Sequence, residues 1–464
     1  MTGTARELEP SILRAYDIRG LVGQNLRVDD AFAIGRAFAT ISAARLGRQP
    51  KLCVAYDGRL SSPDLEAALV KGLAKSGADV VRAGLGPTPM LYYAVTALGR
   101  DGGVMVTGSH NPPEFNGFKL TLCGLPFWDQ DIQSLGRAIA DGNLAEGHGS
   151  ASEVSVERDY VARVAAEYRS KVPLSVAWDA GNGAAGEVIR SLVNFLPGQH
   201  IVLNSKIDGT FPSHHPDPTV AENLDQLISA VMEHSCDLGV GFDGDGDRIG
   251  VVDNKGKIIW GDQLLTLYAI DLLQELPGST IIADVKSSLV FFEQVTSHGG
   301  NPVMWCTGHS PIKSKMTELK APLAGEMSGH IFFADRYYGY DDAIYAAVRL
   351  LDLLARSGCS LATLHDQLPT TFHTPELRFP CDDGLKFKVV DLVRESLEGL
   401  QGIEVNSIDG VRVTTPDGWW LLRASNTQPV LVARCEAEDE DGLARLKAML
   451  KEQLGCCGFV APVF

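Results

Sequence analysis

Three aspartates stand at alternate positions of the segment GFDGDGDR, which covers residues 241–248: Asp243, Asp245 and Asp247. Carboxylates this close repel one another unless a cation lies among them. The glycines between them let the backbone curl so that the side chains converge, and Mg²⁺ and Ca²⁺ prefer oxygen ligands of this kind. An EF-hand loop would need glycine and glutamate where the chain has Arg248 and Asn254. The segment therefore predicts a divalent-metal site, with a solvated acidic turn as the weaker alternative.

A serine follows another apolar run. Residues 104–106 have the pattern of a buried strand, and the polar segment TGSHNP, residues 107–112, comes directly after it. Loops at strand ends are common places for functional side chains. A serine-hydrolase elbow would need glycine at the positions of Thr107 and Asn111, so that class is not supported. The residues alone leave Ser109 as either a nucleophile or an ordinary turn former.

A third polar loop brings a carboxylate, a hydroxyl and an imidazole together between glycines, in residues 325–330: Glu326, Ser328 and His330. A carboxylate can accept hydrogen bonds from two neighbouring hydroxyls, which suits the diol of a sugar. Taken by themselves, these residues fit a capped turn better than a binding site.

A fourth loop is rich in hydrogen-bond donors, which are Arg423, Ser425, Asn426 and Thr427. An arginine, two hydroxyls, an amide and loop N–H groups can together form a nest for a phosphate. The loop lies between two strand-like runs, and a plain hairpin turn explains it as well as a phosphate site does.

Two segments match the glycine pattern of dinucleotide-binding proteins, residues 181–186 and 239–244, and Asp208 follows the first at a suitable spacing. The pattern permits a nicotinamide-dependent dehydrogenase. Two matches in one chain show how little the pattern discriminates, and the second match runs into the aspartate cluster. The sequence contains no Walker-type phosphate loop, so an ATPase of that class is not supported.

A strand that ends in aspartate, followed by a turn, a helix and a second strand, occurs three times along the chain. The first strands of these units are residues 51–57, 174–179 and 280–284, about a hundred residues apart. This order is typical of β-α-β units with short crossovers. The sequence therefore predicts three related α/β domains with mixed, largely parallel sheets.

The C-terminal part has a different pattern. Its strand-like runs lie at residues 376–379, 411–413, 419–423 and 430–434, and a charged helix follows at 439–454. This order indicates a smaller α+β domain with an antiparallel sheet.

Four domains are therefore expected, each with one of the polar loops. The stretch 142–157, polar and rich in glycine and serine, suits the first boundary. The expected domains are residues 1–153 with the serine loop, 154–256 with the aspartate loop, 257–369 with the Glu326 loop and 370–464 with the Arg423 loop.

Composition limits the kind of protein. The chain has 464 residues, 45% of them hydrophobic, which is enough for large cores and excludes a disordered chain. Its 41 basic and 58 acidic residues give a formal charge of −17, which disfavours nucleic-acid and anionic-membrane binding. The nine cysteines are irregularly spaced, so we expect a reducing compartment. We expect neither a membrane span nor a secretory signal, and hence a cytoplasmic protein.

Taken together and in this order, the four loops and the segment AYDIRG, residues 15–20, resemble the α-D-phosphohexomutase family. The bacterial phosphomannomutase/phosphoglucomutase branch is the most similar, and the likeness covers essentially the whole chain. The resemblance implies four domains around a central active-site cleft, three related α/β units and a smaller fourth. It also implies an isomerase that interconverts hexose 1-phosphates and 6-phosphates of mannose and glucose.

The same resemblance implies the chemistry. Ser109 would carry a phosphoryl group and pass it to the free hydroxyl of the hexose phosphate. A 1,6-bisphosphosugar would form, turn over in the site and return its other phosphate to the serine. Mg²⁺ would be held by the three aspartates and a phosphate oxygen on Ser109, and glucose 1,6-bisphosphate would act as the activator.

The resemblance also implies roles for the remaining candidates. Those near the reacting atoms are Lys119 and Arg19, which would assist proton transfer, and His330, His309 and Arg248 beside them. Those that would bind the substrate are Glu326 and Ser328 on two ring hydroxyls, Arg423, Ser425, Asn426 and Thr427 on the non-reacting phosphate, and Tyr16 and Lys286 in the cleft wall.

Three positions depart from the family pattern. Gln428 stands where a second threonine is common, Cys306 where a basic residue is usual, and Ser288 where close relatives often have arginine. They lie near the loops expected to contact phosphate, so they bear on affinity and on the preferred sugar.

Two alternatives stay open. A phosphoglucosamine mutase is the nearer one, although Met327 favours the mannose and glucose type. A non-catalytic sugar-phosphate sensor would need a degenerate site, and the intact Ser109, Lys119 and aspartates argue against it. The expected partners are small hexose phosphates, with no nucleic acid or membrane, and a monomer is expected with an oligomer left open.

Overall fold

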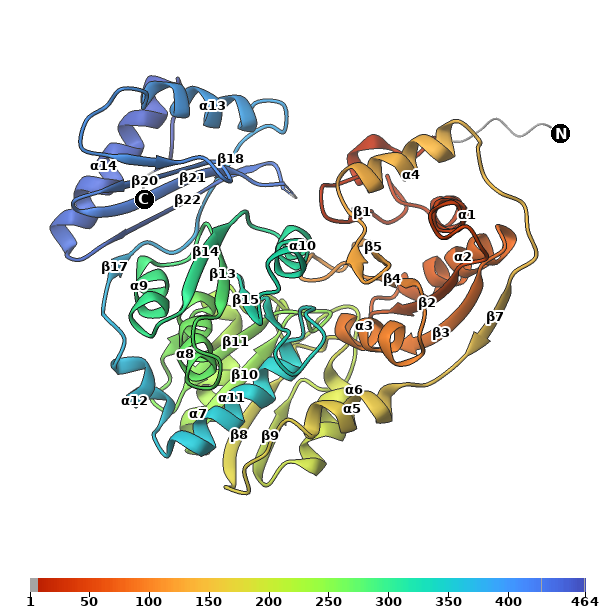
Figure 1. Cartoon of the computed structure of the whole chain (residues 1–464), viewed down its shortest axis with the longest axis horizontal. Coiled ribbons are helices and arrows are strands. Elements are labelled where there is room, and N and C mark those ends of the chain that lie inside the picture. The colour runs from red at the N-terminus through yellow and green to blue at the C-terminus, as the bar shows by residue number, and fades with distance from the viewer. Residues whose placement is uncertain (1–6, 427, 463) are drawn as a thin grey trace.

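The computed structural model describes residues 7–426, 428–462 and 464, so Thr427, a predicted phosphate ligand, lies outside the described residues. The described chain forms four sheets with helices packed on them (Figure 1). In the view of Figure 1, the first unit, in red and orange, lies at the right and the last, in blue, at the upper left. The two middle units, in yellow, green and cyan, lie below and between them.

The first sheet has the strand order β1-β5-β4-β2-β3-β7, with β6 beside β5. Strands β4, β2, β3 and β7 are parallel neighbours, whereas β5 runs antiparallel to β4 and β1. The strands are β1 (Ile18–Leu21), β2 (Lys51–Tyr56), β3 (Asp79–Leu85), β4 (Gly102–Val106), β5 (Phe115–Leu122), β6 (Leu125–Pro126) and β7 (Ser150–Glu153). The helices are α1 (Val28–Leu46), α2 (Ser62–Lys75), α3 (Thr88–Ala97) and α4 (Gln130–Ala140).

The second sheet has the order β12-β11-β10-β8-β9, in which β10, β8 and β9 are parallel and β11 is antiparallel to β10. Its strands are β8 (Leu174–Asp179), β9 (Gly198–Leu203), β10 (Leu238–Phe242), β11 (Ile249–Asp253) and β12 (Ile258–Ile259). Its helices are α5 (Glu157–Ala165), α6 (Gly186–Leu192) and α7 (Asp225–Glu233).

The third sheet has the order β14-β13-β15-β16, and only β16 runs antiparallel to its neighbour. Its strands are β13 (Thr280–Asp284), β14 (Asn301–Trp305), β15 (Leu323–Gly325) and β16 (Ile331–Phe333). Its helices are α8 (Gly261–Glu275), α9 (Leu289–Ser297), α10 (His309–Leu319), α11 (Ala343–Ser357) and α12 (Leu361–Asp366).

The fourth sheet is antiparallel, with the order β17-β22-β21-β20-β19 and β18 beside β22. Its strands are β17 (Phe372–His373), β18 (Leu377–Pro380), β19 (Glu404–Asn406), β20 (Val411–Thr415), β21 (Gly418–Ala424) and β22 (Val430–Ala437). Its helices are α13 (Lys386–Ser396) and α14 (Glu440–Cys456). The predicted fold class, three mixed α/β sheets and a smaller antiparallel α+β unit, is confirmed.

Several observed elements were not indicated by the sequence patterns, and helix α13 and strand β7 are among them. Helix α13 lies where the sequence indicates no element, and β7 lies inside the polar stretch 142–157 that suits a boundary. Strand β7 is exposed along its whole length, so no apolar alternation marks it. Polar pairs with β3 hold it instead: Ser150 Oγ donates to Asp79 at 2.9 Å and Arg82 to Glu153 at 2.9 Å. The four domain boundaries stay a prediction.

The same hairpin recurs in all four units. Strand β4 turns into the antiparallel β5, β10 into β11, β15 into β16 and β21 into β22. The four connecting loops carry Ser109, the three aspartates, Glu326 and Ser425–Asn426, respectively. Ligands of α/β sheets bind at the carboxyl ends of strands. The repeated topology therefore places the four polar motifs at corresponding positions.

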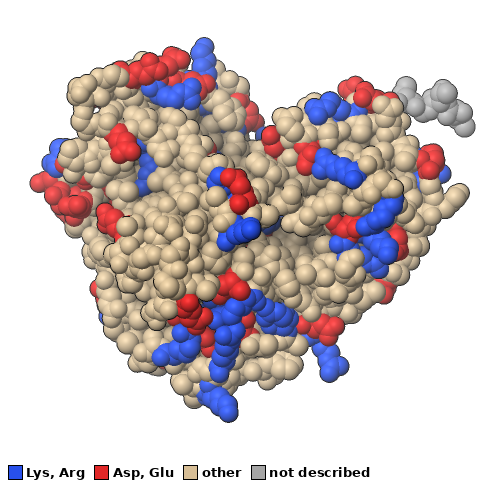
Figure 2. Space-filling view, viewed as in Figure 1, with Lys and Arg blue, Asp and Glu red and all other residues tan. Residues whose placement is uncertain are grey.

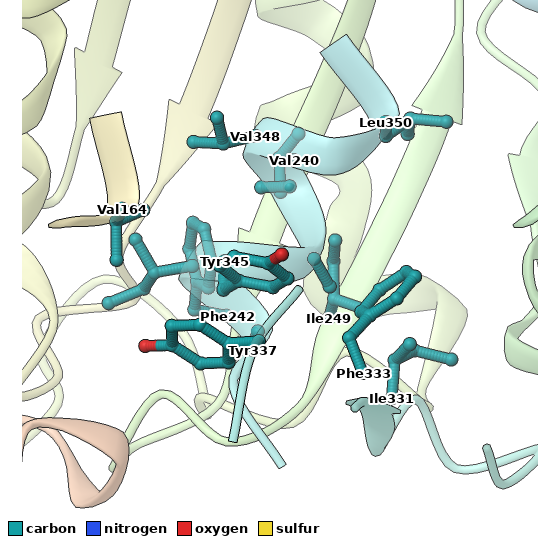
Figure 3. Packing of buried hydrophobic residues seen from close by; sticks show 14 of the residues in the cluster. Val164, Val240, Phe242, Ile249, Ile331, Phe333, Tyr337, Tyr345, Val348 and Leu350 are labelled. Carbon is teal, nitrogen blue, oxygen red and sulfur yellow. The ribbon is translucent and has the colours of Figure 1, made fainter. Parts of the chain in front are cut away.

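Apolar packing holds the aspartate loop at both ends. Phe242 and Ile249, which flank the loop, are 2% and 3% exposed and belong to a large core cluster. Figure 3 shows them beside Tyr337 and Tyr345, whose rings stack with centroids 3.8 Å apart. Because β10 and β11 are fixed in this core, the carboxylates between them stay together despite their repulsion. No helix in the described part of the chain is long and apolar enough to cross a membrane.

An ion pair in the second unit makes stability depend on pH. His214 Nε2 lies 2.9 Å from Asp179 Oδ2, and this contact raises the pKa of His214. A raised histidine pKa adds stability that is fully present below the unfolded-state value, about 6.5, and is lost as pH rises through the folded-state value. His214→Gln is therefore expected to lower the melting temperature more at about pH 5.5 than at about pH 9. An equal loss at both pH values would contradict this account.

Candidate active site

The four loops converge on one cavity of about 580 Å³, which is lined by residues from all four units. Figure 2 shows a notch in this face of the molecule, between the first unit and the last. A cavity of this size is typical of a small-molecule site. The predicted residues in its wall are Tyr16, Arg19, Arg248, Lys286, His309, Glu326, Ser328, His330, Arg423, Ser425 and Asn426. Ser109, Lys119 and the three aspartates are buried behind this wall.

The fold presses the serine loop against the aspartate loop. Ser109 is 2% exposed, and its hydroxyl donates to Asp243 Oδ2 at 3.1 Å. Its φ of +50° is unusual for a residue with a side chain and costs of order 1 kcal/mol. A Cβ on Gly244 would lie only 2.4 Å from the Ser109 carbonyl oxygen, so glycine permits this close approach. The serine hydroxyl thus lies at the edge of the carboxylate cluster.

The three aspartates are fully buried, and one carboxylate oxygen of each lies within 4.8 Å of the others. Lys119 Nζ lies 2.7 Å from Asp245 Oδ2 and also contacts Asp247 Oδ2. The Oδ1 atoms of Asp245 and Asp247 are buried and have no hydrogen-bond partner among the described residues. Two such oxygens, beside a third carboxylate and a serine hydroxyl, form a donor set that fits a hard divalent cation.

The charges of the cluster favour a further cation. Burial, and then the charges of Asp245 and Asp247, raise the pKa of Asp243 well above its usual range. Burial also raises the pKa of Asp247, whereas Lys119 outweighs burial at Asp245 and lowers its pKa. Burial alone would lower the pKa of Lys119, but the two carboxylates hold it well above its usual range. The protonated lysine thus balances only part of the charge of the triad.

His330 is held between an arginine and an aspartate. Arg248 Nε donates to His330 Nε2 at 2.9 Å, so the ring proton is on Nδ1. Nδ1 lies 3.1 Å from Asp341 Oδ2, and Lys313 Nζ holds the other oxygen of that carboxylate at 2.8 Å. The ring of His309 lies 5.6 Å from that of His330, and burial, followed by the charge of Lys313, lowers the pKa of His309 well below its usual range. His309 is therefore neutral.

Two residues of the first unit, Arg19 and Tyr16, line the cavity, and Tyr16 also contacts other units. Arg19 donates to Asp17 Oδ2 at 2.5 Å and to Asn111 Oδ1, in the serine loop, at 3.1 Å. The Tyr16 hydroxyl donates to the Thr307 carbonyl at 2.7 Å and accepts from Asn426 Nδ2 at 2.5 Å. Tyr16 therefore touches both the third and the fourth unit and closes one side of the cavity.

The carboxylate of Glu326 is oriented by hydrogen bonds from the protein, and these bonds do not use all of its acceptor capacity. Ser328 Oγ donates to its Oε2 at 2.9 Å, and Gly308 N donates to its Oε1 at 3.1 Å. Asp284, at the end of β13, accepts from Met327 N at 3.1 Å and so fixes the loop. Each Glu326 oxygen keeps acceptor capacity for a ligand hydroxyl.

The fourth unit supplies the donors at the far end of the cavity. Arg423 Nε donates to Asp409 Oδ2 at 3.0 Å, which directs the guanidinium. Ser425 Oγ accepts from Gln428 N at 3.1 Å within the loop after β21. Asn426 completes this group through its contact with Tyr16. The predicted phosphate-binding residues that the structure describes are thus brought together.

Lys286 joins this group from the third unit. Its Nζ lies 3.0 Å from Glu376 Oε2, and Arg378 donates to the other oxygen of Glu376 at 2.9 Å. Although burial opposes ionisation, Lys286 and Arg378 lower the pKa of Glu376 to about 2. Glu376 thus pairs with both Lys286 and Arg378, Asp284 Oδ2 lies 3.8 Å from Lys286 Nζ, and Arg423 adds a third basic group to this wall.

Comparison with known families accounts for every unit. Residues 10–146, 158–256 and 260–372 match the models of phosphoglucomutase/phosphomannomutase alpha/beta/alpha domains I, II and III, and residues 376–453 match the C-terminal domain. The chain belongs to the phosphoglucomutase/phosphomannomutase family. The predicted family resemblance is confirmed.

Individual members of the family are similar over nearly the whole chain. The phosphomannomutase/phosphoglucomutase of Pseudomonas aeruginosa PAO1 is 44% identical over 462 residues, which is 100% of this chain and 99% of that protein. The phosphoglucomutase of Neisseria gonorrhoeae is 42% identical over 95% of this chain and 96% of that protein. A solved structure of a phosphoglucomutase/phosphomannomutase family protein from Burkholderia thailandensis has a TM-score of 0.91 at 42% identity, covering 98% and 99% of the two chains.

Family membership and geometry leave the dehydrogenase interpretation without support. The glycine turn at residues 181–186 packs against the aspartate loop: a Cβ on Gly183 would lie 2.8 Å from the Gly244 carbonyl oxygen. In this family member the turn therefore allows two loops of the second unit to approach each other closely.

The three departures from the family pattern lie in different surroundings. Gln428 lines the cavity and accepts from Arg378 at 3.2 Å. Ser288 lies outside the cavity wall, where its hydroxyl donates to Glu436 at 2.8 Å and caps the start of α9. Burial, followed by Asp409, raises the pKa of Cys306 to about 11, so its thiol is neutral. Of the three, Gln428 is the residue placed to influence ligand binding directly.

The structure adds supporting residues that the sequence patterns did not single out. Thr88 donates to Asp245 from both its hydroxyl and its backbone N–H. Asp57 directly follows β2 and accepts from the serine loop, and Asp284, the last residue of β13, accepts from the Glu326 loop. The recurrence along the sequence of strands that end in aspartate could have pointed to Asp57 and Asp284 as supporting residues. Asp341 belongs to no motif, so nothing local marks it.

Proposed function

We propose that the chain is a Mg²⁺-dependent phosphohexomutase that interconverts mannose and glucose 1-phosphates with their 6-phosphates through a phosphoserine at Ser109. The observation that carries the proposal is the contact of Ser109 Oγ with Asp243 Oδ2 at 3.1 Å, at the edge of three buried carboxylates. The names of the two similar proteins, phosphomannomutase/phosphoglucomutase and phosphoglucomutase, support the reaction class.

The metal would be held by Asp243, Asp245, Asp247 and a phosphate oxygen on Ser109. When bound, Mg²⁺ would neutralise charge on the transferring phosphoryl group. Phosphoryl transfer otherwise needs mainly in-line positioning. The buried loops of the first and second units support this positioning, because they fix the serine against the carboxylates.

Proton transfer is assigned to residues around the serine. The sugar hydroxyl attacks the phosphorus and loses a proton, while the bond between phosphorus and Ser109 Oγ breaks and that oxygen gains one. His330 would accept the first proton at Nε2 once Arg248 Nε, which donates to that atom at 2.9 Å, turns to the transferring phosphoryl group. Protonated Lys119 is suited to supply the second, and Arg19 and His309 would assist beside them.

Substrate binding must serve two orientations, since the bisphosphosugar turns over before the second transfer. The cavity of about 580 Å³ leaves room for this motion. Glu326 and Ser328 would hold two ring hydroxyls, and Arg423, Ser425, Asn426 and Lys286 would hold the non-reacting phosphate. We assign Thr427 to the same phosphate from the sequence alone. Tyr16 would close the cavity over the ligand.

The proposal is tested by supplying glucose 1-phosphate, Mg²⁺ and a trace of glucose 1,6-bisphosphate as activator, and following glucose 6-phosphate. Mannose 1-phosphate is run in parallel. Turnover of both sugars is expected, whereas turnover of glucosamine 1-phosphate alone would replace this proposal with a phosphoglucosamine mutase. No turnover of any of the three would leave the sensor interpretation. We also propose that the protein is cytoplasmic and monomeric. Sedimentation of the purified protein would test its oligomeric state.

A specificity prediction follows from Glu326. If its carboxylate binds hydroxyls other than O2, it does not contact the C2 position at which glucose and mannose differ. Glu326→Ala is therefore expected to lower kcat/KM by about 100-fold for both 1-phosphates, because a hydrogen bond to a charged group contributes about 1.5–3 kcal/mol. Glu318→Ala, which removes an exposed partner of Lys315, is the control. A strong change in the glucose-to-mannose ratio would contradict the prediction.

A further inference from the structure

Arg59 lies beneath the serine loop with a side chain that is 0% exposed. All five of its side-chain N–H donors are used. Nε donates to Asp57 Oδ2 at 3.1 Å. The two terminal nitrogens donate to four loop carbonyls: those of Pro112 at 2.6 Å, Phe115 at 2.9 Å, Ser109 at 2.7 Å and Asn111 at 2.6 Å.

This contact determines the shape of the loop. Four carbonyls between residues 109 and 115 turn inward to one planar group, so the serine side chain is directed away from it, toward the aspartates. The positive φ of Ser109 has to be maintained by its surroundings, and the guanidinium bonds its carbonyl directly. Only arginine carries five donors in a rigid planar fork. A lysine at position 59 would keep the charge but not this geometry.

Asp57 holds both the arginine and the start of the loop. Its Oδ2 accepts from the Thr107 hydroxyl at 2.8 Å and from Gly108 N at 3.2 Å, besides Arg59 Nε. Its Oδ1 accepts from the Ser62 hydroxyl at 2.5 Å. The aspartate at the end of β2 is therefore the fixed point from which the arginine reaches the loop.

Arg59 also contacts the unit that carries the aspartates. The ring of Phe211 lies over its guanidinium, with Cζ 5.2 Å from the ring centroid. A Cβ on Gly209 would lie 2.7 Å from Arg59 Cα, so the two units are closely packed here. One side chain thus connects the serine loop with the second unit, and it does not belong to the cavity wall.

We propose that Arg59 is a positioning residue for phosphoryl transfer: it sets Ser109 Oγ at its distance from the metal-binding carboxylates without touching the substrate. The inference rests on the proposed function. A displacement of about 1 Å in a reacting group can cost about 100-fold in rate. Loss of the arginine should therefore lower the rate of phosphoryl transfer and leave the affinity for the sugar unchanged.

The test is Arg59→Lys in the full-length protein, with three readouts. We expect kcat for glucose 1-phosphate to fall about 100-fold, while KM changes less than about 3-fold. The rate at which glucose 1,6-bisphosphate phosphorylates Ser109, followed by intact mass, should fall in parallel with kcat. The matched control is Arg349→Lys, another buried arginine, bonded to Asp335 at 2.9 Å in the third unit. It should lower the melting temperature without slowing phosphorylation of Ser109.

An unchanged kcat and phosphorylation rate in Arg59→Lys would overturn the inference. Equal slowing of phosphorylation in Arg349→Lys would also overturn it, since any buried arginine would then have the same effect. If Arg59→Lys is insoluble, Asp57→Asn decides, and normal phosphorylation there would overturn the inference. Failure of the proposed function can be told apart from failure of this inference, because the unmodified chain would then show no turnover. In that case the inference, which rests on the proposed function, would fail as well.

Discussion

Replacement of Ser109 by alanine is expected to lower kcat for glucose 1-phosphate by about 10⁴-fold or more, because the covalent carrier of the phosphoryl group is lost. The backbone of the loop should keep its place, since Arg59 and Asp57 bind its carbonyl and N–H groups rather than the hydroxyl. The assay is the coupled measurement of glucose 6-phosphate, with melting temperature as the check on folding.

Ser42→Ala is the matched control for this variant. Ser42 is a fully buried serine of α1 in the same unit, and its hydroxyl has no hydrogen-bond partner among the described residues. Its replacement should leave kcat within about 2-fold, since a buried hydroxyl without a hydrogen-bond partner contributes little to the stability of the fold. Residual activity of Ser109→Ala within about 10-fold of the unmodified protein would show that the serine is not the phosphoryl carrier.

Replacement of Asp247 by asparagine is expected to raise the Mg²⁺ concentration for half-maximal activity by about 100-fold, and kcat at saturating Mg²⁺ should fall as well. The carboxylate has a buried Oδ1 without a partner among the described residues, and asparagine would offer a neutral oxygen in its place. Removal of metal by a chelator should abolish turnover in the unmodified protein, and added Mg²⁺ should restore it.

Asp253→Asn is the control for the metal variant. Asp253 ends β11, is 1% exposed and accepts from the backbone N–H groups of Lys255 and Lys257 at 2.8 and 2.9 Å. Its replacement should affect the stability of that turn and leave the Mg²⁺ dependence unchanged. Full activity in the presence of excess chelator would contradict the metal assignment.

The polar loops were predictable because their signals are local. The segment of residues 241–248 combines alternating acids with glycines, and Gly246 indeed has a φ of +72°. The apolar runs on either side of it form β10 and β11. A motif of this kind states both the chemistry and the turn that presents it, so one sequence is enough to find it.

The supporting contacts could not be predicted, because they join side chains to the backbone of distant segments. Arg59 binds carbonyls 50 to 56 residues away, and no residue type is required at those positions. Asp341 holds His330 from outside every motif. In the same way β7 lacks an apolar face, and only its pairing with β3 identifies it.

The four repeated hairpins could be predicted only in part. The sequence showed three β-α-β units and four polar loops, but not that each loop follows the same turn from one strand into an antiparallel partner. That equivalence depends on strand order, which a single sequence does not determine. It explains why the loops that carry residues as distant as Ser109, Asp243, Glu326 and Ser425 converge on one cavity.

The central claim is that the phosphoryl group passes through Ser109. The most direct measurement is to incubate the dephosphorylated protein with glucose 1,6-bisphosphate and Mg²⁺, locate the added phosphoryl group by peptide mass spectrometry, and then add glucose 1-phosphate. The account predicts one phosphoryl group on Ser109 that leaves at the rate of turnover. Turnover with the group on another residue, or with no phosphorylated protein at any time, would contradict it.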